Sequence, residues 1–200
     1  MNNLRSLALI VVALGSSTLA GCRHAPSGPM SLPLHWAASA EDLTVFPAAG
    51  VEVLRRRAIA VEPFTDARDR RDAVGSNVEQ GGAVPVTTPD DVPKFLAGRF
   101  AEVLSANGVH PVASGPDRVI HTEVQRFFII ESGLYNGDVA LGITVTDGSG
   151  VVLWHGVSEG RSKRFGRSFS AENYQEALSS AAVEALKNLG ETPDFFNAFK

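Results

Sequence analysis

Cysteine is almost absent from this sequence, since Cys22 is the only one among 200 residues. One cysteine cannot form a disulfide within the chain, so a hydrophobic core has to stabilise the fold. The composition, with 44% hydrophobic and 20% charged residues, is that of a globular domain with a substantial core. Disorder of the whole chain is therefore excluded.

The sequence also lacks an apolar run long enough to cross a bilayer. Its longest near the N-terminus is Leu7–Leu14, whereas a membrane-spanning helix needs about 20 apolar residues. Arg5 precedes this run and small or polar residues 15–21 follow it, which is the pattern of an export signal. We therefore predict that residues 1–21 are a signal peptide that is removed.

Positive charge is scarce as well. Residues 1–21 hold one of the 18 basic residues and none of the 22 acidic ones, so the chain beyond them has a formal charge of −5. This charge excludes a protein built to bind nucleic acid. The five histidines show no HExxH spacing, and the segment 75–82 lacks the Lys-Ser/Thr ending of a phosphate-binding loop. We expect neither a metal site nor catalysis.

The four residues Leu19-Ala20-Gly21-Cys22 resemble, in every position, the lipobox of bacterial lipoproteins. The resemblance implies that signal peptidase recognises Leu19, Ala20 and Gly21, that the Cys22 sulfur receives diacylglycerol, and that its freed amino group receives an acyl chain such as palmitate. These chains are the only added group we expect, and no other cofactor. Each buried CH₂ contributes about 0.8 kcal/mol, so several chains anchor a protein stably.

Two alternatives concern the same cysteine and its neighbour. An ordinary secretory signal cut near Ala20 would leave Cys22 as a free thiol, which is an unusual residue in an exported protein. Arg23 follows the cysteine where enterobacterial lipoproteins retained in the inner membrane have Asp. By this resemblance we expect the protein on the periplasmic face of the outer membrane.

The mature chain is predicted to have two parts. Residues 22–50 comprise the lipidated cysteine, a proline-containing tether of about ten residues, at most about 35 Å long, and an irregular segment that packs on the domain. Residues 51–200 form a single α/β domain with a C-terminal helix and an aromatic tail.

Hydrophobic periodicity predicts the elements of this domain. We expect strands within 57–64, 109–113, 118–132, 139–145 and 151–157, a polar loop over 65–89, and helices after Thr88 and after Ser170. Thr88 is the expected cap of the first helix, Asn107-Gly108 its end, and Asn136-Gly137 the turn of a tight hairpin. The predicted fold is a two-layer sandwich with a mainly antiparallel sheet, two helices on one face, and the order β-α-β-β-β-β-α.

The strand at 118–132 has an alternating pattern that assigns its faces. Ile120, Val124, Phe128 and Ile130 are expected in the core, and His121, Glu123, Gln125 and Phe127 on the open face. Together with Asp66 and Arg68, the residues of the open face are the predicted partner surface.

Three other segments admit two interpretations. The triplet 55–57 and the basic segment 160–169, which contains Phe165 and Phe169, either contact anionic groups such as lipid headgroups or are solvated. The tail 195–199, with three phenylalanines, either folds onto the core or waits for a partner.

The lipobox, the strand that ends near Phe64-Thr65-Asp66-Ala67-Arg68, the helix that ends in Asn107-Gly108-Val109, the meander and the last helix together resemble the YajG-like family of bacterial lipoproteins. The resemblance covers about residues 57–190 and implies an envelope location and a two-layer fold. That family has no established activity to transfer.

From these observations we expect a non-catalytic, membrane-anchored lipoprotein that binds a protein or an envelope component. The first alternative is an accessory subunit of an envelope lipid or glycolipid transport system, which would need an apolar groove for an acyl chain. The second is a hydrolase, which would need a pocket that brings Asp66, Arg68 or a histidine together with a perturbed pKa.

Overall fold

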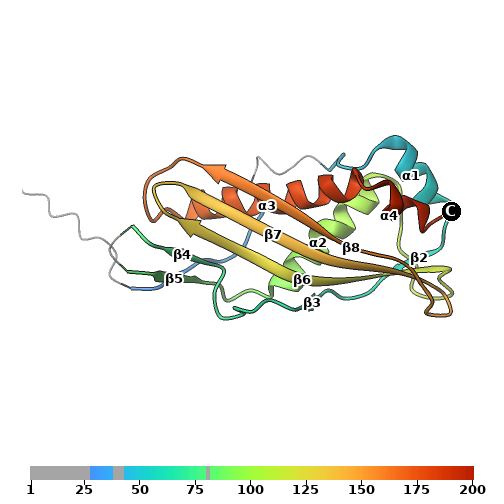
Figure 1. The fold of residues 1–200 in the computed structure, drawn as a ribbon, viewed down its shortest axis with the longest axis horizontal. Helices are drawn as coiled ribbons and strands as arrows, with labels where there is room; N and C mark the ends of the chain where they lie inside the picture. Colours follow the sequence, from blue (N-terminus) through green and yellow to red (C-terminus); the bar gives the residue numbers. More distant parts are fainter. Residues whose placement is uncertain (1–27, 38–42, 80–81) are drawn as a thin grey trace, which may run out of the picture.

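The computed structural model describes residues 28–37, 43–79 and 82–200, which form a mixed α/β fold around an eight-stranded sheet (Figure 1). The strands are β1 (Met30–Ser31), β2 (Ile59–Val61), β3 (Thr65–Asp66), β4 (Gly75–Asn77), β5 (Val84–Thr87), β6 (Arg118–Glu131), β7 (Tyr135–Asp147) and β8 (Val152–Arg164). The helices are α1 (Ala48–Arg55), α2 (Val92–Ala106), α3 (Ala171–Gly190) and α4 (Pro193–Asn197). The α/β class agrees with the prediction.

The sheet is mixed, so the predicted two-layer sandwich with a mainly antiparallel sheet and the order β-α-β-β-β-β-α is wrong. The long strands β6, β7 and β8 do form the expected antiparallel meander. Along the other edge of β6, however, β2, β3 and β4 follow one another in parallel. β5 is antiparallel to β4, and β1 is parallel to β5.

The added strands come from the segment predicted to be a polar loop, 65–89, and from the region before residue 50. They are two to four residues long. Strands this short show no clear alternation of polar and apolar residues, so the pattern does not reveal them. The expected strand at 109–113 does not form, and α1, which was not predicted, spans the expected boundary between residues 50 and 51.

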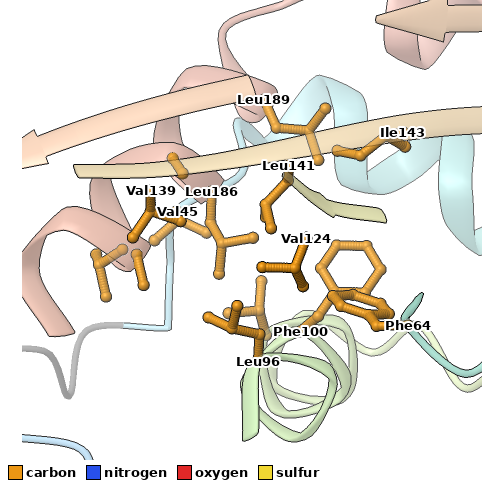
Figure 2. Close-up of a cluster of buried hydrophobic side chains, with 14 of the residues drawn as sticks. Val45, Phe64, Leu96, Phe100, Val124, Val139, Leu141, Ile143, Leu186 and Leu189 are labelled. Carbon is orange, nitrogen blue, oxygen red and sulfur yellow. The ribbon is translucent and has the colours of Figure 1, made fainter. Parts of the chain in front are cut away.

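The core lies where α2 and α3 meet the sheet. α3 contacts β7 and β8, and α2 contacts β3 and β6. Figure 2 shows Leu96 and Phe100 of α2 converging with Val124 of β6, Leu141 of β7 and Leu186 of α3. All five side chains are buried, as the apolar stripes of the two helices predict.

α3 approaches the sheet closely because small residues meet there. An added Cβ on Gly137 of β7 would lie 2.7 Å from the Ala177 carbonyl oxygen, so no side chain fits at this glycine. Asn136-Gly137 was predicted as a turn, and this is wrong, since Gly137 lies inside β7. The turn comes earlier, around Gly133, whose φ of +76° suits glycine.

The ends of α2 agree with the sequence in part. Asp91, rather than Thr88, is the N-cap, and its side chain accepts a hydrogen bond of 2.9 Å from the Lys94 amide. Asn107 ends the helix as predicted, and Gly108 follows with φ of +70°.

The two terminal segments pack onto the domain. Leu32 is fully buried, and Val45 and Phe46 are also in the core. Phe195 and Phe199 of the tail are buried, and Phe195 contacts Phe46 and Trp154. Of the two interpretations of the aromatic tail, the structure supports folding onto the core.

Candidate functional site

The candidate site lies on the face of β6, β7 and β8 that α2 and α3 do not cover. Polar residues of the three strands stand in rows across this face, because paired residues point to the same side. One row places Thr144 of β7 between His121 of β6 and His155 of β8, and another places Gly142 between Glu123 and Val157. His121 and Glu123 therefore lie on the open face, as predicted.

A β-bulge at Gln125 changes which residues of β6 face the core. Val124 pairs with Leu141 and Arg126 with the next residue, Ala140, so Gln125 is the extra residue. The extra residue shifts the alternation by one position for the rest of the strand. Gln125 is exposed and its side chain lies across Gly142, where an added Cβ would be 2.4 Å from Gln125 Nε2.

The bulge overturns the predicted face of three residues, Phe127, Phe128 and Ile130. Phe127 was expected on the open face but is 1% exposed, and Ile129 is fully buried. Phe128 and Ile130 were expected in the core but lie on the open face, and Ile130 is 44% exposed. Phe127 is therefore part of the core beneath the open face and offers no exposed surface to a partner.

Asp66 and Arg68 form a structural pair at the edge of this face. The Arg68 guanidinium donates two hydrogen bonds of 2.9 Å to the Asp66 carboxylate and two longer ones to the carbonyl oxygens of Ala73 and Arg71. Arg68 is 7% exposed. Its hydrogen bonds to Asp66 lower the pKa of that carboxyl, although partial burial opposes the shift. The pair holds the segment between β3 and β4 in place.

The bulge and this segment enclose a shallow hollow of about 270 Å³. Its lining includes Arg68, Arg70, Gln125, Arg126 and Phe128. The Arg70 guanidinium lies 5.3 Å from the centre of the Phe128 ring, a cation–π arrangement. Arginines beside an aromatic ring can bind a carboxylate or a planar polar group of a partner.

Arg126 links the hollow to the neighbouring strands. Its guanidinium forms ion pairs with Asp138 of β7 at 3.0 Å and with Glu159 of β8 at 3.8 Å. Arg126 was not predicted at this site and Phe128 was predicted in the core, because their place depends on the bulge, and Arg70 was hidden in the segment predicted as a polar loop. A bulge leaves only a weak signal, a break in the alternation after Gln125.

An acid, a histidine and a hydroxyl lie in line at the other end of the face. His121 Nδ1 is 2.9 Å from a Glu62 carboxylate oxygen, and His121 Nε2 is 3.3 Å from Thr146 Oγ1. This order of groups occurs in hydrolases. However, Thr146 is 7% exposed, and the main hollows of the described chain are lined by other residues.

A second hydrolase feature occurs within β8. Gly156-Val157-Ser158-Glu159-Gly160 has the spacing of a nucleophile elbow, which is a sharp turn from strand to helix. Here the five residues lie inside β8 and pair continuously with β7, and Ser158 is 5% exposed. Its hydroxyl donates to the Ala185 carbonyl oxygen of α3, so Ser158 serves the contact between helix and sheet.

An apolar groove of about 740 Å³ lies at the end of the molecule where α1 meets α4. Val45, Phe46, Val53 and Phe196 are among its lining residues. Within the described ranges, no three His, Cys, Asp or Glu residues are close enough to hold a metal ion. Nor does any helix of these ranges have the length and apolar character to span a bilayer.

The predicted lipidation site lies outside the described residues. This applies to Cys22 and to Leu19, Ala20 and Gly21. The structure therefore places Asp66, Arg68, His121, Glu123 and Gln125 along one face. The lipobox at residues 19–22 remains a prediction from the sequence.

Comparisons with known proteins concern the fold. No protein-family model matches the chain, and no curated protein is similar to it in sequence. A solved structure of a Xanthomonas campestris protein from the family DUF330 superposes with a TM-score of 0.53 at 13% identity, over 80% of this chain and 91% of the other. A lipoprotein candidate from Caulobacter crescentus gives a TM-score of 0.48 at 12% identity, over 76% and 98%. At 13% identity, the DUF330 superposition shows a shared fold.

Proposed function

We propose that this chain is a bacterial envelope lipoprotein, anchored through Cys22 to the periplasmic face of the outer membrane, which binds a protein or another envelope component without catalysing a reaction. The observation that supports the anchor is the complete lipobox, Leu19-Ala20-Gly21-Cys22, after an apolar segment too short to span a bilayer. The resemblance to YajG-like lipoproteins agrees with this proposal.

Only a short segment separates the folded domain from the proposed anchor. Gly28, the first described residue, follows Cys22 by six residues, and Met30 already pairs with β5. Six residues span at most about 20 Å when fully extended. The domain is thereby restricted to partners close to the membrane surface.

Replacement of the cysteine tests the anchor. The Cys22→Ala protein is expected in the soluble periplasmic fraction, because the diacylglycerol acceptor is gone. Arg23→Asp is the matched variant, since it keeps the cysteine and is expected to remain in a membrane fraction but to move from the outer to the inner membrane. An anchor at Cys22 is contradicted if Cys22→Ala protein stays in the membrane fraction.

The partner surface is proposed to be the open face around the hollow at Gln125. Its arginines and the half-buried Phe128 offer both charge and an aromatic surface. Photo-crosslinking from position 123 or 125 in the native envelope should capture one specific partner. Position 184, an exposed glutamate on α3, is the matched control and should not capture it. Equal capture from both positions would contradict this surface.

A second candidate function, an accessory of envelope lipid transport, is favoured by the apolar groove at α1 and α4. This groove lies at the surface, whereas the space between sheet and helices is filled by the core. Native mass spectrometry of the purified protein should then detect a bound lipid, and Ala49→Phe in the groove should abolish it. Ala113→Phe, at an exposed position that does not line the groove, is the control. A lipid-free protein contradicts this second function.

A further inference from the structure

One end of the sheet gathers five strand ends in a single row. Asn77 of β4 pairs with Val84 of β5 and with Glu131 of β6. Glu131 pairs with Tyr135 of β7, and Tyr135 pairs with Arg164 of β8. The loops that follow or precede these residues therefore emerge side by side at this end.

The described chain begins at the same end. β1 runs parallel to β5 with Met30 opposite Val86, so Gly28, two residues before Met30, lies level with Val84. Figure 1 shows β4 and β5 at the end of the sheet where β8 leads into α3, far from α4 and the C-terminus. We call this end, from which the chain runs back to Cys22, the tether end.

The loop between β8 and α3 presents an aromatic ring and positive charge at the tether end. Phe165 is 85% exposed. Lys163 and Arg167 on either side of it are exposed and form no ion pair within the described part of the chain, whereas Arg164 is 3.6 Å from Glu176. Val78 and Ile130, next to the row, add apolar surface with 42% and 44% exposure.

Hydrogen bonds hold the backbone of this loop in one conformation. The Tyr135 hydroxyl donates to the Arg167 carbonyl oxygen and accepts from the Ser170 amide at 3.0 Å. The Phe169 amide donates to the buried Glu131 carboxylate at 2.8 Å. The loop therefore presents Phe165 from a fixed base, which lowers the entropy lost when its ring is immobilised in a contact.

The acidic groups of the tether end are largely engaged. Glu131 is buried, and Glu79 accepts from the Gly133 amide and the Ser168 hydroxyl. Glu176 pairs with Arg164, and Glu172 lies in the first turn of α3, where the helix dipole favours a negative charge. The outermost side chains of the β8–α3 loop are thus an aromatic ring flanked by two cations.

We propose that the tether end docks on an anionic phospholipid surface, with Phe165 between the headgroups and Lys163 and Arg167 on the phosphates. An aromatic ring with basic neighbours suits this interface, since the ring enters the headgroup boundary and the charges meet anionic lipids. The inference rests on the proposed function, because the lipid on Cys22 brings this end of the domain to the membrane.

The opposite end of the meander differs in charge and provides the control. The β7–β8 turn also exposes apolar residues, with Val151 at 58%. Asp147 stands at its base, and no basic residue lies between Asp147 and Val152. With β7 rising about 3.3 Å per residue, the two ends of the strand are about 40 Å apart. When the tether end docks with the strands steeply inclined to the membrane, the β7–β8 turn is therefore held away from it.

A fluorescent label at each end distinguishes the two. Cys22 is consumed by lipid under the proposed function, so Phe165→Cys or Val151→Cys gives a lipoprotein with one free thiol for a nitrobenzoxadiazole label. The lipidated proteins are reconstituted into vesicles of phosphatidylethanolamine and phosphatidylglycerol that contain a spin-labelled lipid as quencher. The label at 165 is expected to be quenched, and the label at 151 is not. Vesicles of phosphatidylcholine alone should reduce the quenching at 165.

Removal of the positive charges of Lys163 and Arg167 tests whether electrostatic attraction to the lipid contributes to docking. Each basic side chain near an anionic surface is worth a factor of about five in binding, so Lys163→Gln with Arg167→Gln should shift the labelled 165 protein about 25-fold toward the undocked state. Arg56→Gln, an exposed cation on the C-cap of α1, is the control and should change nothing.

Flotation of the same samples separates the two proposals. If the lipoprotein floats with vesicles but the labels at 165 and 151 are quenched equally, or neither is quenched, the docking proposal is overturned and the anchor stands. If quenching of the label at 165 is the same in charged and uncharged vesicles and is unchanged by Lys163→Gln with Arg167→Gln, a charge-dependent contact is overturned. If the protein does not float, the anchor itself fails, and with it the docking proposal.

Discussion

Gly160 of β8 lies directly against Ala181 of α3, so closely that an added Cβ would be 2.1 Å from the Ala181 carbonyl oxygen. The neighbours of Gly160 on the same side of β8 are also small. Ser158 and Ser162 donate to the carbonyl oxygens of Ala185 and Ala177. The alanines of α3 thus meet a glycine and two serines, and the helix rests on the backbone of the strand.

Gly160→Ala is expected to destabilise the protein, because its methyl group would have to push α3 away from β8. Insertion of a methyl group into a filled contact costs about 1–3 kcal/mol, which urea unfolding of the purified protein would detect as a lower midpoint. Gly98→Ala in α2 is the matched control. No atom lies within 4 Å of its added Cβ, so the free energy of unfolding should rise by about 0.5–1 kcal/mol. Equal effects of the two variants would contradict this account.

Glu131 is expected to make stability depend on pH in the acid range. Burial alone raises the pKa of this carboxyl, but hydrogen bonding by Tyr174, Ser168, the Phe169 amide and Asn77 together outweighs burial, and the net pKa lies below its ordinary value of 4.5. A lowered folded pKa means that the charged form adds stability above the unfolded pKa and that this stability is lost as pH falls through the folded value.

Glu131→Gln tests this dependence. The variant removes the charge but keeps the size, and at neutral pH it should cost about 1–3 kcal/mol, because charged hydrogen bonds are replaced by weaker or unmade ones. The difference from the wild type should shrink as pH falls below about 4.5. Urea unfolding from pH 3 to pH 7 measures it, and a difference independent of pH would contradict a charged Glu131.

Arg68→Ala is expected to destabilise the segment between β3 and β4. The change leaves the Asp66 carboxylate and two backbone carbonyl oxygens without their donor, and loss of one partner from a buried pair costs about 3 kcal/mol. Arg68→Lys keeps the charge but not the paired hydrogen bonds, so its loss should be smaller. Thermal unfolding distinguishes the two variants, and an unchanged midpoint for Arg68→Ala would show that the pair is dispensable.

Asp91→Ala should cost about 1 kcal/mol, because Asp91 accepts from the Lys94 amide at the start of α2. Thr88→Ala is the comparison suggested by the sequence. The Thr88 hydroxyl accepts only from the exposed Asp90 amide, so its loss should cost less. Urea unfolding ranks the two residues, and a larger effect of Thr88→Ala would restore Thr88 as the cap.

The elements that the sequence predicted well are long and periodic. α2, α3 and the three long strands have apolar residues at the spacing of one face, and this pattern depends only on local geometry. In β6, the faces assigned to the side chains from their alternation were correct up to Gln125 and wrong beyond it. The bulge arises from pairing with β7, so residues of a distant strand decided the face of Phe127 and Phe128.

The turn predicted at Asn136-Gly137 was wrong for a similar reason, because contacts with a distant element decide the place of this glycine. Asn136-Gly137 has the composition of a tight turn, but Gly137 is needed where α3 crosses β7. The short strands β3 and β4 likewise form because β6 offers them an edge, and β5 forms on the edge of β4. Neither the position of α3 over β7 nor the free edge of β6 can be predicted from the local sequence.

By itself, the sequence determined the lipobox-like segment that ends at Cys22, the acidic character of the chain, the α/β class and the two main helices, because these depend on residue type and local spacing. The tertiary structure decided which side chains share a surface. It brought Arg70, Arg126 and Phe128 to one hollow, and it set the β8–α3 loop at the same end of the sheet as Gly28, the first described residue. Strand register and helix packing are sums of many contacts between distant residues, so they are determined only when the chain folds.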